Sequence, residues 1–177
     1  GYWFYKDNKL NLYAAVDFAF SLSKKADSTA IVVIGIDADN NVYVLDIDRF
    51  KTDRISVYFD HIFHLVNKWS FRKMRAETTV AQMAIVRQLK ELIKQHGLSL
   101  SINEYRPNKN QGNKQERIAS ILEPRYDNMS MWHYRGGNIQ ILEEELSSRN
   151  PAHDEVIDDL ASAVDMAVKP SRKIFRS

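Results

Sequence analysis

Three acidic residues far apart in the sequence stand where folding could bring them together. Asp17 ends the apolar run LYAAVD, Glu77 ends the stretch FRKMRAE, and Asp154 opens the acidic segment DEVIDDLASAV. Hard cations such as Mg²⁺ and Mn²⁺ bind carboxylate oxygens, and two ions about 3.5 to 4 Å apart can activate a water and stabilise the leaving oxygen of a phosphodiester. If the three acids meet, we expect metal-dependent phosphodiester hydrolysis.

Each acid also has a purely structural explanation. An Asp that ends a strand is often a turn former, and an exposed Glu such as Glu77 can help to start the next helix. The acids of the last segment can stabilise a helix dipole. Asp158 lies four residues after Asp154 and shares its helix face, so both are available to a site on that face.

The elements that must position these acids follow from the hydrophobic pattern. Strands are predicted at 12–17, 30–36, 42–50, 71–77 and 98–106. The link between the first two is too short for a helical crossover, so the first three strands are expected to form an antiparallel meander. Right-handed crossovers would then place the fourth strand beside the first, with Asp17 and Glu77 side by side.

Helices are expected to cover this sheet. Amphipathic patterns predict helices at 54–69, 80–97, 113–123 and 153–168. A β-hairpin with a Gly136-Gly137 turn is predicted at 125–139. The expected fold is therefore α/β, with a mixed central sheet that combines the meander and parallel strands, flanked by helices and extended by a hairpin.

Length and composition favour a single domain. The chain has 177 residues, of which 44% are hydrophobic, and a net charge of +2. We expect one domain over 1–177, with its core at about 12–168 and a flexible tail at 169–177. The absence of cysteine excludes disulfides, thiolate zinc sites and a cysteine nucleophile.

The sequence gives no sign of a membrane segment or a signal peptide. No apolar run approaches the roughly 18 to 20 residues that span a bilayer, so we expect a soluble, cytoplasmic protein without a membrane partner. The chain starts with GYWF instead of Met, and we expect it to be part of a longer polypeptide.

Two stretches resemble motifs of the nuclease domain of phage terminase large subunits. The run VDFAFSLSKKADSTAIVVIG is similar to their first nuclease motif, in which a strand ends in Asp and a small polar loop leads to a second Asp and a Thr-Ala. The run HDEVIDDLASAV is similar to their closing motif, His-Asp-Asp, two variable positions, then Asp-Ala-Leu-Ala. The resemblance covers about 12–168.

This resemblance implies a ribonuclease H-like domain that cuts concatemeric viral DNA during genome packaging, in the cytoplasm of an infected bacterial host. It implies two Mg²⁺ or Mn²⁺ ions and, as partners, double-stranded DNA, a packaging ATPase domain, a small terminase subunit and the portal. No GxxxxGK[ST] motif occurs, so the ATPase is not expected within this chain.

The resemblance also assigns roles to individual residues. It makes Asp17 and Glu77 metal ligands and Asp154 the third, with Asp27 as a supporting or second-metal residue. Glu155 stands where a second Asp is common and Asp159 where Ala is common. The third ligand could therefore be Asp158, although we favour Asp154.

Four basic residues are expected to contact the DNA backbone, which supplies most of the sequence-independent affinity. They are Arg106, Lys109, Lys114 and Arg117. A solvated basic loop is the alternative reading. At the level of function, the alternatives are a junction resolvase, an RNA-cutting enzyme of the same fold, or a non-catalytic module that binds DNA or a motor.

Overall fold

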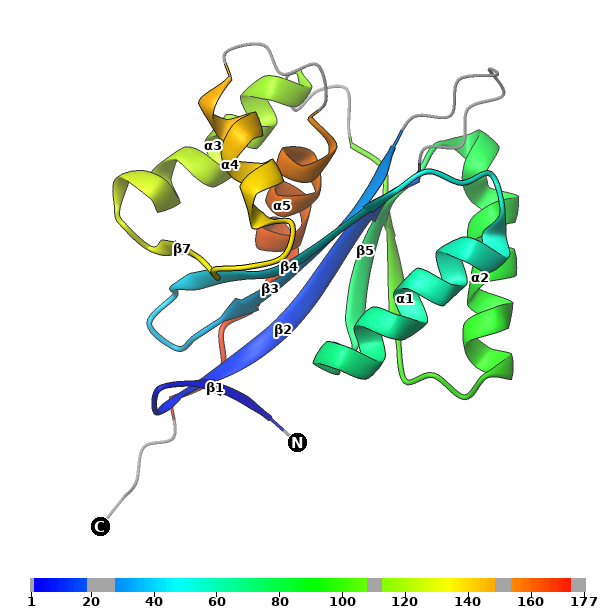
Figure 1. Ribbon diagram of the computed structural model, residues 1–177, viewed down its shortest axis with the longest axis horizontal. Helices are drawn as coiled ribbons and strands as arrows, with labels where there is room; N and C mark the ends of the chain where they lie inside the picture. The colour runs from blue at the N-terminus through cyan, green and yellow to red at the C-terminus, as the bar shows by residue number, and fades with distance from the viewer. Residues whose placement is uncertain (1, 19–27, 108–112, 149–153, 173–177) are drawn as a thin grey trace.

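A seven-stranded mixed sheet forms the centre of the protein, with helices on both of its faces (Figure 1). The structure is a computed structural model that describes residues 2–18, 28–107, 113–148 and 154–172. The strands are β1 (Trp3–Tyr5), β2 (Asn8–Asp17), β3 (Thr29–Ile36), β4 (Val42–Phe50), β5 (Lys73–Glu77), β6 (Ser101–Tyr105) and β7 (Met131–His133). The helical elements are α1 (Ile55–Trp69), the 3₁₀ turn η1 (Val80–Gln82), α2 (Met83–Gln95), α3 (Lys114–Asp127), α4 (Ile139–Ser147) and α5 (Glu155–Met166).

The strand order β6-β5-β2-β3-β4-β7 confirms the predicted α/β fold with a mixed sheet. Strands β2, β3 and β4 form the predicted antiparallel meander. Strand β5 lies parallel to β2, on the side away from β3, as the crossover rule requires. In this pairing Asp17 is the direct register partner of Glu77.

Two hydrophobic cores, one on each face of the sheet, hold the helices in place. Helices α1 and α2 cover one face, where Ala14 and Val16 of β2 are buried. Helices α3, α4 and α5 cover the other face, where Tyr13 and Ala15 are buried (Figure 1). Strand β3 is buried along its whole length, which explains its continuous apolar sequence.

The β-hairpin predicted at 125–139 is wrong. Helix α3 continues to Asp127 and so occupies the place of the first hairpin strand. The short strand β7 pairs in parallel with β4 and not with a neighbouring hairpin strand. Gly136 and Gly137, with φ angles of 127° and 56°, lead into α4 instead of a hairpin turn. The physical reason is that Ile139 and Leu142, at helical spacing, are both buried in the core.

A hairpin does occur at the N-terminus, where β1 pairs antiparallel with β2. The tail that was expected to be flexible from residue 169 is described only as far as Arg172. Within it Pro170 is buried and Arg172 pairs with Asp39. No helix in the described ranges is long and apolar enough to span a membrane.

Candidate metal centre

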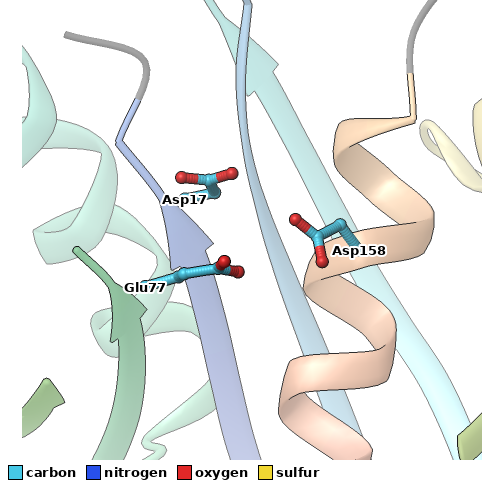
Figure 2. Close-up of side chains that lie close together, drawn as sticks. All are labelled: Asp17, Glu77 and Asp158. Atoms are coloured by element: carbon cyan, nitrogen blue, oxygen red, sulfur yellow. The ribbon is translucent and has the colours of Figure 1, made fainter. Parts of the chain in front are cut away.

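Asp17, Glu77 and Asp158 point toward one another at one end of the sheet (Figure 2). One carboxylate oxygen from each side chain can be chosen so that all three lie within 4.8 Å of one another. Asp17 and Glu77 end the neighbouring parallel strands β2 and β5, which explains their proximity. Asp158 comes from α5, whose Leu160 and Ala163 are fully buried against the sheet side of the core.

Burial and mutual repulsion disfavour the ionised forms of these three carboxylic acids. Burial, followed by the charges of Glu77 and Asp158, raises the pKa of Asp17 from 3.8 to about 7, although Lys114 opposes the rise. Burial and the charge of Asp158 likewise raise the pKa of Glu77 above its ordinary value. Burial raises the pKa of Asp158, against the opposing charges of Lys114 and Arg117. A bound cation would relieve this repulsion.

Two basic side chains of α3 reach into the cluster. Lys114 Nζ lies 3.4 Å from Asp154 Oδ1 and 3.3 Å from Asp158 Oδ2. Arg117 Nη2 lies 3.7 Å from Glu77 Oε1. The start of α3 is held by a capping interaction in which the Asn113 side chain accepts a hydrogen bond from the Glu116 backbone N–H at 2.8 Å.

Several solved structures have an architecture similar to this one. The large terminase nuclease from thermophilic phage G20c matches with a TM-score of 0.62 and 15% identity, over 93% of this chain and 91% of that chain. The Fowlpox virus resolvase, solved with Holliday junction DNA, matches with a TM-score of 0.54 and 9% identity, over 86% and 96%. Thermus thermophilus RuvC matches with a TM-score of 0.50 and 11% identity, over 86% and 90%. The protein has the ribonuclease H-like fold.

The fold implied by the resemblance to terminase nuclease domains is thereby confirmed. No protein-family model and no curated protein sequence matches the chain. At these sequence identities the structural similarity identifies the ribonuclease H-like fold alone. The chemistry of this domain must be argued from its own residues.

In this ribonuclease H-like domain two of the three acids favoured from the sequence, Asp17 and Glu77, lie together, and the third carboxylate beside them is Asp158. Asp154 precedes the first turn of α5, its side chain is 41% exposed, and it does not join the group of three. Asp158, the alternative, occupies that place with a side chain only 4% exposed. Asp27 lies outside the described residues.

Of the predicted DNA-binding residues, Lys114 and Arg117 lie beside the acids and form ion pairs with them. Arg106 is exposed and follows Tyr105, the register partner of Glu77. It therefore lies at the same end of the sheet as the three acids. Lys109 lies outside the described residues.

Asp159 is an additional buried acid that the sequence reading did not assign to the site. Its side chain is 2% exposed, and burial, together with the charges of Asp17 and Asp158, raises its pKa well above the ordinary value. The sequence did contain a sign of this residue, because Asp159 stands where the closing motif of terminase nuclease domains commonly has alanine.

The donor set fits a hard divalent cation. The three side chains offer only oxygen atoms, which Mg²⁺ and Mn²⁺ prefer. Asp158 Oδ2 is buried and makes no hydrogen bond of good geometry within the described part of the chain, and the Lys114 ammonium at 3.3 Å is its ion-pair partner. Among the residues that the structure describes, Asp17, Glu77 and Asp158 are therefore the best placed to hold a metal ion.

Proposed function

We propose that the protein is a divalent-metal-dependent endonuclease that hydrolyses phosphodiester bonds in double-stranded DNA. The observation that carries this proposal is the convergence of three carboxylates, from β2, β5 and α5, to within 4.8 Å of one another. Turn formation or helix capping would not require three acids from separate elements to meet at a half-buried point.

Mg²⁺ or Mn²⁺, held by Asp17, Glu77 and Asp158, would supply an activated water and stabilise the leaving oxygen. The chain's own residues prepare that step. Asp17 must give up its proton to act as a ligand, which its pKa of about 7 allows near neutral pH. Arg117 forms an ion pair with Glu77 and so offsets part of the negative charge of the cluster.

Basic residues around the cluster would hold the DNA backbone. Lys114 and Arg117 flank the acids, and the exposed Arg106 extends the positive charge along the same sheet edge. Because such contacts involve phosphates and not base edges, we expect cleavage with little sequence preference.

The biological role that fits this chemistry is cleavage of concatemeric viral DNA during genome packaging, in the host cytoplasm. The support is the pair of terminase-like motifs around Asp17 and Asp158, together with the structural likeness to the terminase nuclease of phage G20c. The proposed partners are a packaging ATPase domain, a small terminase subunit and the portal.

A plasmid-nicking assay tests the proposed activity. Supercoiled plasmid is incubated with Mn²⁺ or Mg²⁺ and wild type, Asp17→Asn or Asp60→Asn, where Asp60 is an exposed residue of α1 that serves as the charge-matched control. Wild type and Asp60→Asn should nick the plasmid, whereas Asp17→Asn and any sample with EDTA should not. Equal nicking by wild type and Asp17→Asn would contradict the proposal, and no nicking by wild type would favour a non-catalytic DNA-binding or motor-binding module.

A junction resolvase is the second candidate, because the similar Fowlpox virus enzyme was solved with Holliday junction DNA. Linear duplex, a four-way junction and an RNA–DNA hybrid, compared at equal concentration, distinguish the possibilities. Preferential cutting of the junction would favour the resolvase, and preferential cutting of the hybrid would favour an RNA-cutting enzyme.

A further inference from the structure

A single ammonium group stands between two carboxylates of α5. Lys114 Nζ is almost equidistant from Asp158 Oδ2, at 3.3 Å, and Asp154 Oδ1, at 3.4 Å. Asp158 also belongs to the group of three acids, whereas Asp154 does not. The lysine therefore links Asp158 of the metal centre to Asp154, a neighbouring carboxylate that does not belong to the group of three.

The lysine is anchored at its backbone, and its side chain is partly exposed to solvent. Asn113 caps the helix that begins at Lys114, and α3 packs against α5. The Lys114 side chain is 43% exposed, so its ammonium has room to move, whereas Asp158 is held with 4% exposure. Burial lowers the pKa of Lys114, but Asp158 and Asp154 outweigh it and raise that pKa, so the group stays positively charged.

We propose that Lys114 is a tethered counter-cation that competes with a second divalent ion for Asp154 and Asp158. This inference rests on the proposed metal-dependent function. Asp154 and Asp158 could together hold a second divalent ion, but that ion would have to approach the same two oxygens, Asp154 Oδ1 and Asp158 Oδ2, that the ammonium now contacts. A first ion held by Asp17, Glu77 and Asp158 would leave the Lys114–Asp154 pair intact, whereas a second ion held by Asp154 and Asp158 would require the lysine to leave.

The competition gives Asp154 a conditional role. It acts as an ion-pair partner in the resting protein and becomes a metal ligand only after Lys114 moves away. A DNA phosphate beside the centre would give the displaced ammonium a new anionic partner, so that substrate favours occupancy by the second ion. The site would then be fully loaded mainly when DNA is present.

A Mn²⁺ titration of DNA-free protein, with free Mn²⁺ measured by electron paramagnetic resonance, tests the competition. Lys114→Gln removes the charge and keeps a polar side chain of similar length. Wild type should bind one ion tightly and a second weakly, and Lys114→Gln should lower the Kd of the second ion about tenfold, equivalent to about 1.4 kcal/mol. Lys114→Arg keeps the charge and should behave like wild type.

Lys90→Gln is the matched control. Lys90 Nζ lies 3.6 Å from Glu104 Oε1, and its side chain is 47% exposed, close to the value for Lys114. Loss of this charge on α2 alters the net charge equally but leaves the metal centre intact, so Mn²⁺ binding should not change. In the Lys114→Gln background, Asp154→Asn should cancel the gained affinity.

The outcomes separate this inference from the proposed function. If Lys114→Gln binds both Mn²⁺ ions with the same affinities as wild type and Lys90→Gln, the competition is overturned while the metal centre stands. If Lys114→Arg gains affinity as Lys114→Gln does, charge is not the cause and the competition is again overturned. If neither wild type nor Lys114→Gln binds Mn²⁺, both the competition and the metal-dependent function fail.

Discussion

Replacing Asp17 with Asn should stabilise the metal-free protein at neutral pH while it removes a metal ligand. Burial and the charges of Glu77 and Asp158 raise the pKa of Asp17 from 3.8 to about 7. Between these two values the unfolded chain has released the Asp17 proton and the folded protein still holds it. The folded state therefore loses stability as the pH rises from about 4 to 7, and the loss is complete above that range.

The pKa difference sets the size of the effect. A difference from 3.8 to about 7 corresponds to about 4 kcal/mol of lost stability at pH 8, and to about 1.5 kcal/mol at pH 5. Asp17 is only half-buried and titrates together with Glu77 and Asp158. Both facts reduce the free energy of unfolding that the single substitution Asp17→Asn can regain. We expect the advantage of Asp17→Asn over wild type to be larger at pH 8 than at pH 5 by at least about 1 kcal/mol.

Urea unfolding in EDTA, at pH 5 and pH 8, measures this advantage. Asp60→Asn removes an exposed acid of α1 and should change the free energy of unfolding by less than about 0.5 kcal/mol at either pH. Saturating Mn²⁺ should stabilise wild type and leave Asp17→Asn unchanged. An advantage of Asp17→Asn that is absent, or that does not grow with pH, would refute the argument that the clustered carboxylates destabilise the metal-free fold.

Four further outcomes follow from the same geometry. Mn²⁺ affinity should rise about tenfold per pH unit below pH 7 and level off above it, because binding displaces the Asp17 proton; calorimetric titrations that show no such slope would contradict this. Asp158→Asn should abolish stabilisation by Mn²⁺ in a thermal melt, whereas Asp154→Asn should retain it, and the reverse order would restore Asp154 as the third ligand. Leu160→Ala should lower the free energy of unfolding by about 2 to 5 kcal/mol in urea, since the side chain is fully buried; a loss under about 1 kcal/mol would mean that α5 is not packed as described. Asn113→Ala should cost about 0.5 to 2 kcal/mol through loss of the α3 cap, and a neutral result in the same assay would show that the cap is not needed.

The pairing of Asp17 with Glu77 could be predicted because it depends on local pattern and a general rule of chain topology. Each acid ends a recognisable strand, and the handedness of crossovers makes those strands neighbours. The identity of the third acid depends on where the last helix begins, and a sequence pattern locates helix ends less precisely than it locates strands of this kind. The predicted helix starts at residue 153 and α5 starts at Glu155, so Asp154 lies before the first turn while Asp158 lies within the helix.

The segment after α3 could not be predicted correctly because its partners are distant in sequence. Strand β7 is only three residues long and pairs with β4, where Trp132 is the register partner of Tyr43. Neither local alternation nor turn chemistry indicates a parallel pairing of that kind. The adjacent Gly136 and Gly137 suggested a hairpin turn, whereas Ile139 and Leu142 are buried on one face of the helix that follows.

The register of β2 and β5 has a consequence for how this protein can diverge. Asp17 and Glu77 are held opposite each other by the hydrogen-bond ladder between two adjacent strands, so their separation does not depend on the length of the connections that leave the sheet. Insertions in those connections can accumulate while the pair stays intact. Deletion of a single residue inside β5 would shift Glu77 to the opposite face of the sheet and separate the pair at once. Homologues should therefore vary widely in loop length and hardly at all in the number of residues within these two strands.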